Sequence, residues 1–536
     1  MADRTKGYFC LVLHAHLPYV RHPEYEDSLE EHWFYEAVAE TYIPIVAILE
    51  QLVEEGVQFR LTMSVSPPLA SMLRDDLLQR RCLRYLERLV ELGEKEVVRT
   101  HRMPEFHPTA QMYLRKAREA LGLFRDRHRC DLLQAFQNLQ DAGVLEITTC
   151  GATHGFLPLM QDSPNAVRAQ IAVGCQSYAE HFRCQPRGMW NAECGYYPGL
   201  DRFLREQGVR YFIVDTHGIL YADRRPIHGV FAPVYCRSGV AAFGRDLESS
   251  KSVWSAEEGY PGDFRYREYY RDIGYDLPLD YIGSYIHESG LRIGTGFKYH
   301  RITGRSCDLA DKQPYDPTAA LAVADAHAGN FMFNRERQVE YLSGLMDRPP
   351  VIVAPYDAEL FGHWWYEGPE FLRSLLRRIH HDSKVLGMIT PSEYLERYPR
   401  NQLATPSLSS WGFRGYCEVW LEETNDWIYR HLHKAAERMI ALANKNRRET
   451  DPIRVRMLNQ AARELLLAQS SDWAFIMKTR TMVEYAVKRT KEHLLNFRDL
   501  WRMLEDHTSN PLYLAGLEGK NNIFPNISYL VYTDPA

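Results

Sequence analysis

Short apolar runs rich in β-branched residues alternate with longer amphipathic segments over the first three quarters of the chain. The short runs predict strands, and the segments between them predict helices. The predicted strands are Tyr8–Leu13, Gln58–Val65, Val144–Cys150, Arg187–Trp190, Val209–Val214, Val351–Pro355 and Val385–Ile389. The predicted helices include Glu31–Glu55, Leu69–Glu94 and Asn165–His181. This alternation is typical of a parallel sheet built from βαβ units.

Two regions interrupt the alternation. Residues from about 220 to 288 are rich in Gly, Tyr, Arg and Asp, and they predict an insertion over the mouth of the fold. After Pro399 the strands are expected to stop, and helices are predicted for Asp426–Asn444, Asp451–Leu467 and Thr479–Leu504. We therefore expect a catalytic domain over residues 1–400 and a C-terminal helical domain over residues 401–536.

Polar residues that could take part in catalysis or binding follow the predicted strands. They are His14 and His16 after the first strand, His154 after the third, Glu193 after the fourth, Asp215 and His217 after the fifth, and Asp357 after the sixth. Functional groups at the C-terminal ends of successive parallel strands are typical of a (β/α) barrel. About seven strands indicate an α/β fold with an incomplete or distorted barrel.

Bulk composition limits the partners and the location. The chain carries 64 lysines and arginines against 70 aspartates and glutamates, so it is not expected to bind nucleic acid or an anionic membrane. The polar start Met1–Gly7 predicts no signal peptide, and no segment has the length of a membrane span. Ten scattered cysteines without a Cys-x-x-Cys pair predict a reducing, cytoplasmic environment.

Two carboxylates stand out. Glu193 and Asp357 each come directly after an apolar strand and lie among Trp and Tyr residues. A carboxylate in such a place is costly unless it is paired, hydrogen-bonded or functional. A helix cap or a salt bridge would explain either one alone. The two together favour glycoside cleavage, which needs one acid to attack the anomeric carbon and another to protonate the leaving oxygen.

The pair His14 and His16 has two interpretations. Both side chains project to the same side of a strand end, so they could bind a metal or hydrogen-bond a polar ligand. A zinc site would need a third ligand, which Asp215, His217 or His154 could supply. A metal-dependent deacetylase or α-mannosidase therefore stays open at this stage.

Four ordered motifs resemble the signature regions of glycoside hydrolase family 57. They are His14-Ala15-His16-Leu17-Pro18, Thr149-Cys150-Gly151-Ala152-Thr153-His154-Gly155-Phe156, Trp190-Asn191-Ala192-Glu193-Cys194, and the run from Ala354 to Trp365. The resemblance implies a distorted seven-stranded (β/α) barrel and retention of configuration. It also implies Glu193 as nucleophile, Asp357 as acid/base, and no cofactor or required metal. His14, His16 and His154 would then bind sugar, and the two carboxyl groups should lie about 5–6 Å apart.

Within that family the chain resembles the members that branch 1,4-α-glucans. The resemblance lies in Phe243–Asp246, Val253–Ser255, Gly259–Asp263, Tyr266–Glu268, Ser410–Gly412, Trp420 and Ser470–Trp473. It implies substrate-binding roles for Arg267, Trp411, Trp420 and Asp472, and a tyrosine at the tip of a loop, for which Tyr260 and Tyr235 are candidates. Trp365 is a further candidate for the aromatic wall, whereas Trp473 is expected to pack in the core.

The implied reaction cleaves an α-1,4 bond and transfers the chain to a 6-hydroxyl, giving an α-1,6 branch in a glycogen-like glucan. An α-amylase or a 4-α-glucanotransferase of the same family is the alternative, because water or a 4-hydroxyl could take the place of the acceptor. A catalytically silent glucan-binding protein is disfavoured by the presence of both Glu193 and Asp357.

Overall fold

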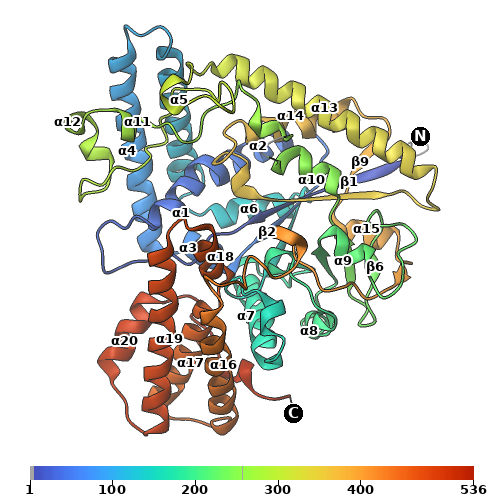
Figure 1. Cartoon of the computed structure of the whole chain (residues 1–536), viewed down its shortest axis with the longest axis vertical. Coiled ribbons are helices and arrows are strands. Elements are labelled where there is room, and N and C mark those ends of the chain that lie inside the picture. The colour runs from blue at the N-terminus through green and yellow to red at the C-terminus, as the bar shows by residue number, and fades with distance from the viewer. Residues whose placement is uncertain (1–4, 256–257, 536) are drawn as a thin grey trace.

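A computed structural model describes residues 5–255 and 258–535. At its centre a sheet of parallel strands curls into a barrel, with helices on its outer face (Figure 1). The barrel strands are β1 (Gly7–Ala15), β2 (Leu61–Val65), β3 (Leu145–Cys150), β4 (Gly188–Trp190), β5 (Tyr211–Val214), β7 (Ala241–Gly244) and β8 (Val351–Asp357). Around the ring they follow the order β8, β1, β2, β3, β4, β5, β7, and each neighbouring pair is parallel.

The ring is distorted where β7 meets β8. A parallel bridge between Arg245 and Val353 closes it there, just beyond the end of β7. Three short strands lie outside the ring: β6 (Val234–Tyr235), β9 (Leu386–Met388) and β10 (Gln402–Leu403). β9 pairs with the first residues of β1, β6 runs antiparallel to β7, and β10 pairs with β6. The predicted α/β fold with a distorted seven-stranded barrel is confirmed.

The membership of the ring differs from the expectation in one strand. All seven predicted strands exist, but the last of them, β9, lies outside the ring. Its place in the ring is taken by β7, which was not predicted. β7 falls within residues 220–288, so part of that region belongs to the barrel. The expectation that strands stop after Pro399 is also wrong by one short strand, β10.

Helices connect the strands and cover the barrel. In the catalytic part they are α1 (Glu31–Ala37), α2 (Ile43–Glu54), α3 (Pro67–Leu73), α4 (Asp76–Thr100), α5 (His107–Leu121), α6 (Leu132–Asp141), α7 (Pro164–Phe182), α8 (Leu200–Glu206), α9 (Thr216–Leu220), α10 (Leu247–Trp254), α11 (Ile273–Asp276), α12 (Leu279–Ile282), α13 (Pro317–Ser343), α14 (Gly368–His381) and α15 (Pro391–Arg397). No helix formed by the described residues is long and apolar enough to cross a membrane.

Two helices predicted as single are interrupted. The segment Glu31–Glu55 forms α1 and α2 around a π-helical turn, η1 (Val38–Tyr42). The segment Leu69–Glu94 is divided because Asp75 caps a new helix, accepting hydrogen bonds from the backbone N–H groups of the second and third residues that follow it.

The C-terminal helices gather in the lower part of Figure 1. They are α16 (Trp427–Lys445), α17 (Pro452–Ala468), α18 (Ser471–Thr479), α19 (Val483–Glu505) and α20 (Pro511–Lys520), which confirms the predicted helical region. The start of α18 touches the loop after β3, because the Ser471 backbone N–H donates to the His154 carbonyl oxygen over 3.0 Å. Helices from the end of the chain thus reach the mouth of the barrel.

Candidate active site

The alternation of side chains along the strands places the candidate residues at the open end of the barrel. In β1 the side chains of Tyr8, Cys10 and Val12 belong to the core inside the ring, so His14 projects to the same side one step further on. In β8 the interior positions Val351 and Val353 lead in the same way to Asp357. His14 and Asp357 are also direct neighbours in the register of β1 and β8.

Glu193 is aimed by an unusual backbone. It follows β4 in the left-handed region, with φ 62° and ψ 26°, and Cys194 after it also has a positive φ of 52°. A non-glycine residue held there costs about 1 kcal/mol or more and is concentrated at functional sites. Two donors from distant segments hold the carboxylate: Trp411 Nε1 at 2.8 Å from Oε2, and Ser471 Oγ at 3.2 Å from Oε1.

The two carboxyl groups hold their protons unusually tightly. Burial raises the pKa of Glu193 to about 7, the charge of Asp357 adds to the effect, and the bond from Trp411 opposes it. Burial raises the pKa of Asp357 to about 8, with a further contribution from Glu359 and opposition from His16 and Arg245. Near neutral pH the site can therefore hold one ionised carboxylate, Glu193, and one protonated acid, Asp357.

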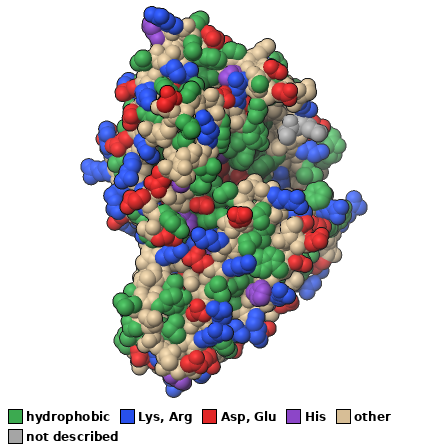
Figure 2. Space-filling model, turned by 60° about the vertical axis from the view of Figure 1, so that its left-hand side comes forward, with side chains coloured by type: hydrophobic (Ala, Val, Ile, Leu, Met, Phe, Trp, Pro, Cys, Tyr) green, Lys and Arg blue, Asp and Glu red, His purple; other side chains and the backbone are tan. Residues whose placement is uncertain are grey.

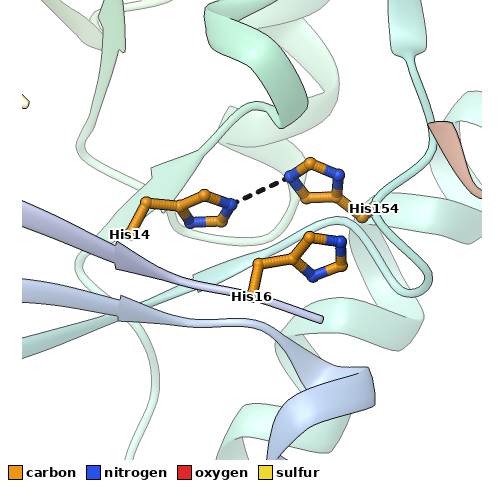
Figure 3. A group of neighbouring side chains, drawn as sticks. All are labelled: His14, His16 and His154. Carbon is orange, nitrogen blue, oxygen red and sulfur yellow. Dashed lines mark hydrogen bonds between the residues drawn. The ribbon is translucent and has the colours of Figure 1, made fainter. Parts of the chain in front are cut away.

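Three histidines, His14, His16 and His154, lie together at the strand ends (Figure 3). His14 and His154 are hydrogen-bonded through their Nε2 atoms at 2.9 Å, and the rings of His16 and His154 stack with centroids 3.7 Å apart. Burial holds the pKa of both His14 and His154 well below the ordinary value, so both rings are neutral. His14 and His154 thus present flat, uncharged rings at the mouth of the barrel.

A chain of hydrogen bonds joins these histidines to Glu193. The Ser471 hydroxyl donates to Glu193, so it accepts from Nδ1 of the neutral His154, 2.8 Å away. His154 Nε2 then carries no proton and accepts from His14 Nε2. The donors are therefore His14, His154 and Ser471, in that order, and the Glu193 carboxylate is the final acceptor. This order fixes the tautomers of His14 and His154.

His16 is held by a residue of the C-terminal helical region. Its Nδ1 is hydrogen-bonded to Ser66 Oγ at 2.8 Å, and its Nε2 lies 3.1 Å from both carboxylate oxygens of Asp472. Burial opposes ionisation of Asp472, but the charge and hydrogen bond of His16 prevail and bring the pKa of Asp472 down to about 2. Asp472, predicted to be a site residue, thus reaches the barrel mouth from α18.

The metal interpretation can be compared with these contacts. The donor atoms of His14, His16 and His154 lie within 4.8 Å of one another, which is close enough for a cation. The set of His14, His16 and Asp215 is not assembled, because Asp215 accepts from Arg245 at 3.0 Å instead. A cation among the three histidines would have to displace the bonds between His14 and His154 and between His16 and Asp472.

Comparisons with known proteins agree with this geometry. Residues 10–407 match the family model described as glycosyl hydrolase family 57, and residues 431–532 match the one described as 1,4-alpha-glucan branching enzyme, C-terminal. The chain belongs to glycoside hydrolase family 57. It is 33% identical to the 1,4-alpha-glucan branching enzyme of Thermococcus kodakarensis, with 97% of this chain and 77% of that protein covered.

Two solved structures superpose over nearly the whole chain. One is described as the novel alpha-amylase AmyC from Thermotoga maritima, with 48% identity, a TM-score of 0.93 and 99% of both chains covered. The other is the GH57-type branching enzyme from Pyrococcus horikoshii, with 32% identity, a TM-score of 0.88, and 99% of this chain and 98% of that chain covered. The comparisons therefore establish the family. They do not decide between transfer and hydrolysis, because one similar structure is described as an amylase and the other as a branching enzyme.

The predicted tryptophans take different places around the family 57 site. Trp411 is half-buried between Trp190 and Trp254, with ring centroids at 4.9 and 5.9 Å. Trp420 is only 1% exposed and stacks on Phe156, so it supports the wall from behind and offers no ring face to a sugar in this structure. Trp365 and Trp473 are also buried in the core, as expected for Trp473.

Arg267 and the two candidate tyrosines lie outside the cluster around the carboxyl pair. Arg267 is buried, stacks on Tyr366 at 3.9 Å and faces Glu40 at 3.7 Å. The Tyr260 hydroxyl donates to Asn330 in α13, and Tyr235 lies in β6. Their contact with substrate stays a prediction of the family resemblance.

Several site residues were missed by sequence reasoning. Glu359, two positions after Asp357, accepts hydrogen bonds from the Tyr42 hydroxyl and from the His16 backbone N–H. The sequence offered a sign of Glu359, since it stands in the same motif as Asp357. Ser471 stands in the segment Ser470–Trp473 that carries the resemblance, but its role could not be read from it, because its partners His154 and Glu193 lie far away in the chain.

Figure 2 shows a hollow on one face of the molecule, walled mainly by hydrophobic side chains with acidic side chains among them. Such a surface suits a sugar chain, because apolar walls cover the faces of pyranose rings and carboxylates bind hydroxyl groups.

Proposed function

We propose that this family 57 protein is a retaining 1,4-α-glucan branching enzyme that acts on a glycogen-like glucan. The observation that carries the proposal is the contribution of the helical region to the site. Residues 431–532 match the branching-enzyme C-terminal model, and from within that stretch Ser471 and Asp472 hold Glu193 and His16. The relatives from Thermococcus and Pyrococcus, which are described as branching enzymes, support it.

In the first step Glu193 attacks C1 of a glucose unit, and the C1–O4 bond to the next unit breaks. Asp357 gives its proton to the departing oxygen, so a neutral 4-hydroxyl leaves and a covalent glucosyl ester remains on Glu193. The states required are an ionised Glu193 and a protonated Asp357, which the raised pKa values of about 7 and about 8 favour near neutral pH.

In the second step Asp357, now ionised, takes the proton from the 6-hydroxyl of an acceptor chain. The acceptor oxygen attacks C1, the ester bond to Glu193 breaks, and an α-1,6 bond forms. Two displacements at C1 retain its configuration. The half-buried ring of Trp411, beside Trp254, is the surface that we expect to hold the acceptor and exclude water.

The histidines position the sugar during both steps. His14 and His154 are neutral and stack in one layer, and Trp190 lies parallel to His14 with ring centroids 4.7 Å apart. His16 is fixed by Asp472 and Ser66 from two different elements. This rigidity keeps the glucose unit in line with Glu193, because orientation of the reacting atoms supplies a large part of the rate.

Hydrolysis is the second candidate, favoured by one observation. The Thermotoga maritima protein that superposes with a TM-score of 0.93 at 48% identity is described as an α-amylase. The same carboxyl pair would then deliver water to C1 in place of a 6-hydroxyl.

Incubation with amylose, followed by enzymatic debranching and chain-length profiling, separates the two reactions. A branching enzyme raises the number of α-1,6 linkages without a matching rise in reducing ends before debranching. Glu193→Gln is the control, since it retains the shape of the site but cannot form the ester. Reducing ends that accumulate without α-1,6 linkages would identify an amylase.

The cytoplasm is the proposed location. All ten cysteines are free, which suits a reducing compartment.

A further inference from the structure

The π-helical turn η1 (Val38–Tyr42) faces the segment that follows Asp357. Such turns are rare and often occur at functional sites. Three consecutive residues of the turn contact that segment. The Tyr42 hydroxyl donates to Glu359, the Thr41 hydroxyl accepts from the His363 backbone N–H at 3.3 Å, and the Glu40 carboxylate lies 2.9 Å from His363 Nδ1.

The backbones of the turn and the segment are also in direct contact. Gly362 has a φ of +118°, and a Cβ built on it would lie 1.8 Å from the Glu40 carbonyl oxygen. Only glycine fits such an approach, so the turn and the segment cannot separate or slide without breaking several contacts. The segment is therefore fixed from both ends, by Tyr42 at Glu359 and by Glu40 at His363.

Glu359 joins this turn to the strand that carries the histidines. Its Oε1 accepts from the Tyr42 hydroxyl and from the His16 backbone N–H, the latter at 3.2 Å. Tyr42 is fully buried, and Glu359 stands two residues after Asp357. A second carboxyl group is thus locked beside the acid/base by donors from two separate elements.

We propose that Glu359, held in place by the π-helical turn, is a positioning residue whose negative charge keeps Asp357 protonated until the glycosidic bond breaks. The inference rests on the proposed role of Asp357 as acid/base. It assigns to Glu359 and Tyr42 the task of setting the pH range in which Asp357 can act.

The charges around Glu359 agree with this assignment. The groups that face it are Tyr42 from the π-helical turn, His363 from the following segment, the backbone of His16, and Asp357 itself. Burial raises the pKa of Glu359 to about 7, and the Tyr42 bond opposes the rise. Glu359 therefore ionises before Asp357, and its charge then disfavours a second negative charge nearby.

The test is the pH dependence of kcat in Glu359→Gln, which keeps the acceptor oxygen for His16 and removes the charge. We expect the descending limb of the plot of kcat against pH to move to lower pH by about one unit, with little change in KM. Well above pH 8 this shift should lower kcat on amylose by up to about tenfold, and it should lower kcat much less on an aryl maltooligosaccharide, whose leaving group departs without a proton. Equal losses on both substrates, or an unmoved limb, would overturn the proposal.

Tyr42→Phe provides a second measurement if Glu359→Gln folds poorly. Without the hydroxyl, Glu359 holds its proton more tightly, so the limb should move in the same direction by a smaller amount. Tyr35→Phe is the matched control, because the Tyr35 hydroxyl donates to another buried carboxylate, Glu31, at 2.6 Å. A limb that moves equally in Tyr35→Phe and Tyr42→Phe would contradict the specific role.

Asp357→Asn separates this inference from the proposed function. If Asp357→Asn keeps activity on amylose, the assignment of the acid/base fails. If Asp357→Asn is inactive and the limb in Glu359→Gln stays in place, only the role of Glu359 fails.

Discussion

Trp411 donates its indole N–H to Oε2 of Glu193 over 2.8 Å, although 218 positions separate the two residues in the chain. The bond acts against the burial that raises the pKa of Glu193. Trp411 therefore has two tasks, since its ring lies along the wall and its nitrogen stabilises the ionised nucleophile. Substitutions that keep one task and remove the other can separate them.

Trp411→Phe keeps an aromatic wall and removes the donor. We expect kcat to fall by about tenfold, because a hydrogen bond to a charged group is worth about 1.5–3 kcal/mol. The ascending limb of the pH profile should move to higher pH, since Glu193 loses a group that favours its ionised form. Trp411→Ala should in addition lower branching more than hydrolysis. Measurement of α-1,6 linkages and reducing ends would show an unchanged ratio if Trp411 only supports packing.

The pH dependence of the parent enzyme follows from its two carboxyl groups. Activity should rise as Glu193 loses its proton, near pH 7, and fall as Asp357 loses its own, near pH 8. The expected profile of kcat/KM is a narrow bell centred between these values. Initial rates on amylose from pH 5 to 10 would check it, and a plateau extending to pH 10 would exclude Asp357 as the acid.

Glu193→Gln should be inactive and yet more stable at high pH. Burial raises the pKa of Glu193 from 4.5 to about 7, so the folded state holds this proton more tightly than the unfolded state. Stability therefore declines as pH rises through that interval, and above it the variant should gain up to about 3 kcal/mol. Melting temperatures at pH 4.5 and pH 8 measure the difference. A gain of equal size at both values would indicate repacking.

Asp472→Asn should weaken the link between the C-terminal helical region and the barrel. The pKa of Asp472 is about 2 in the folded protein, below the ordinary 3.8, so its charge stabilises the fold above about pH 4. Loss of that charge should cost about 2 kcal/mol at pH 7 and lower kcat/KM by roughly tenfold or more, since His16 keeps only Ser66 as a side-chain partner. Asp506→Asn, at an exposed position after α19, is the control. Equal effects in the two variants would contradict a role at the site.

Removal of metal ions should leave activity unchanged. The histidine nitrogens that approach one another are already hydrogen-bonded to His154, Ser66 or Asp472. We expect full activity on amylose after dialysis against EDTA, and no gain on adding zinc. Loss in EDTA with recovery in zinc would reassign the three histidines as ligands.

The sequence predicted the fold where local patterns are strong. The apolar run of β1, the β-branched runs of β3 and β8, and the period of α7 needed no tertiary information. β7 was missed because Ala241-Ala242-Phe243-Gly244 has no β-branched residue and stands in a Gly-rich and Arg-rich region. The π-helical turn η1 was missed because its residues fit an ordinary helix.

The candidate site was predicted in part for a related reason. Glu193, Asp357 and the three histidines stand at strand ends, where a barrel brings side chains together whatever the intervening sequence is. Ser471 and Trp190 contribute through contacts that depend on how α18 and β4 pack. The burial of Trp420 likewise depends on Phe156 and on the turn at Gly412.

The position of α18 also bears on when activity can begin during synthesis. Domains generally fold as they leave the ribosome, N-terminal part first. All seven barrel strands are complete by Asp357, yet Ser471 and Asp472 lie more than a hundred residues downstream. A nascent chain with a finished barrel therefore still lacks the groups that hold Glu193 and His16, and we expect activity to begin only after α18 has been made.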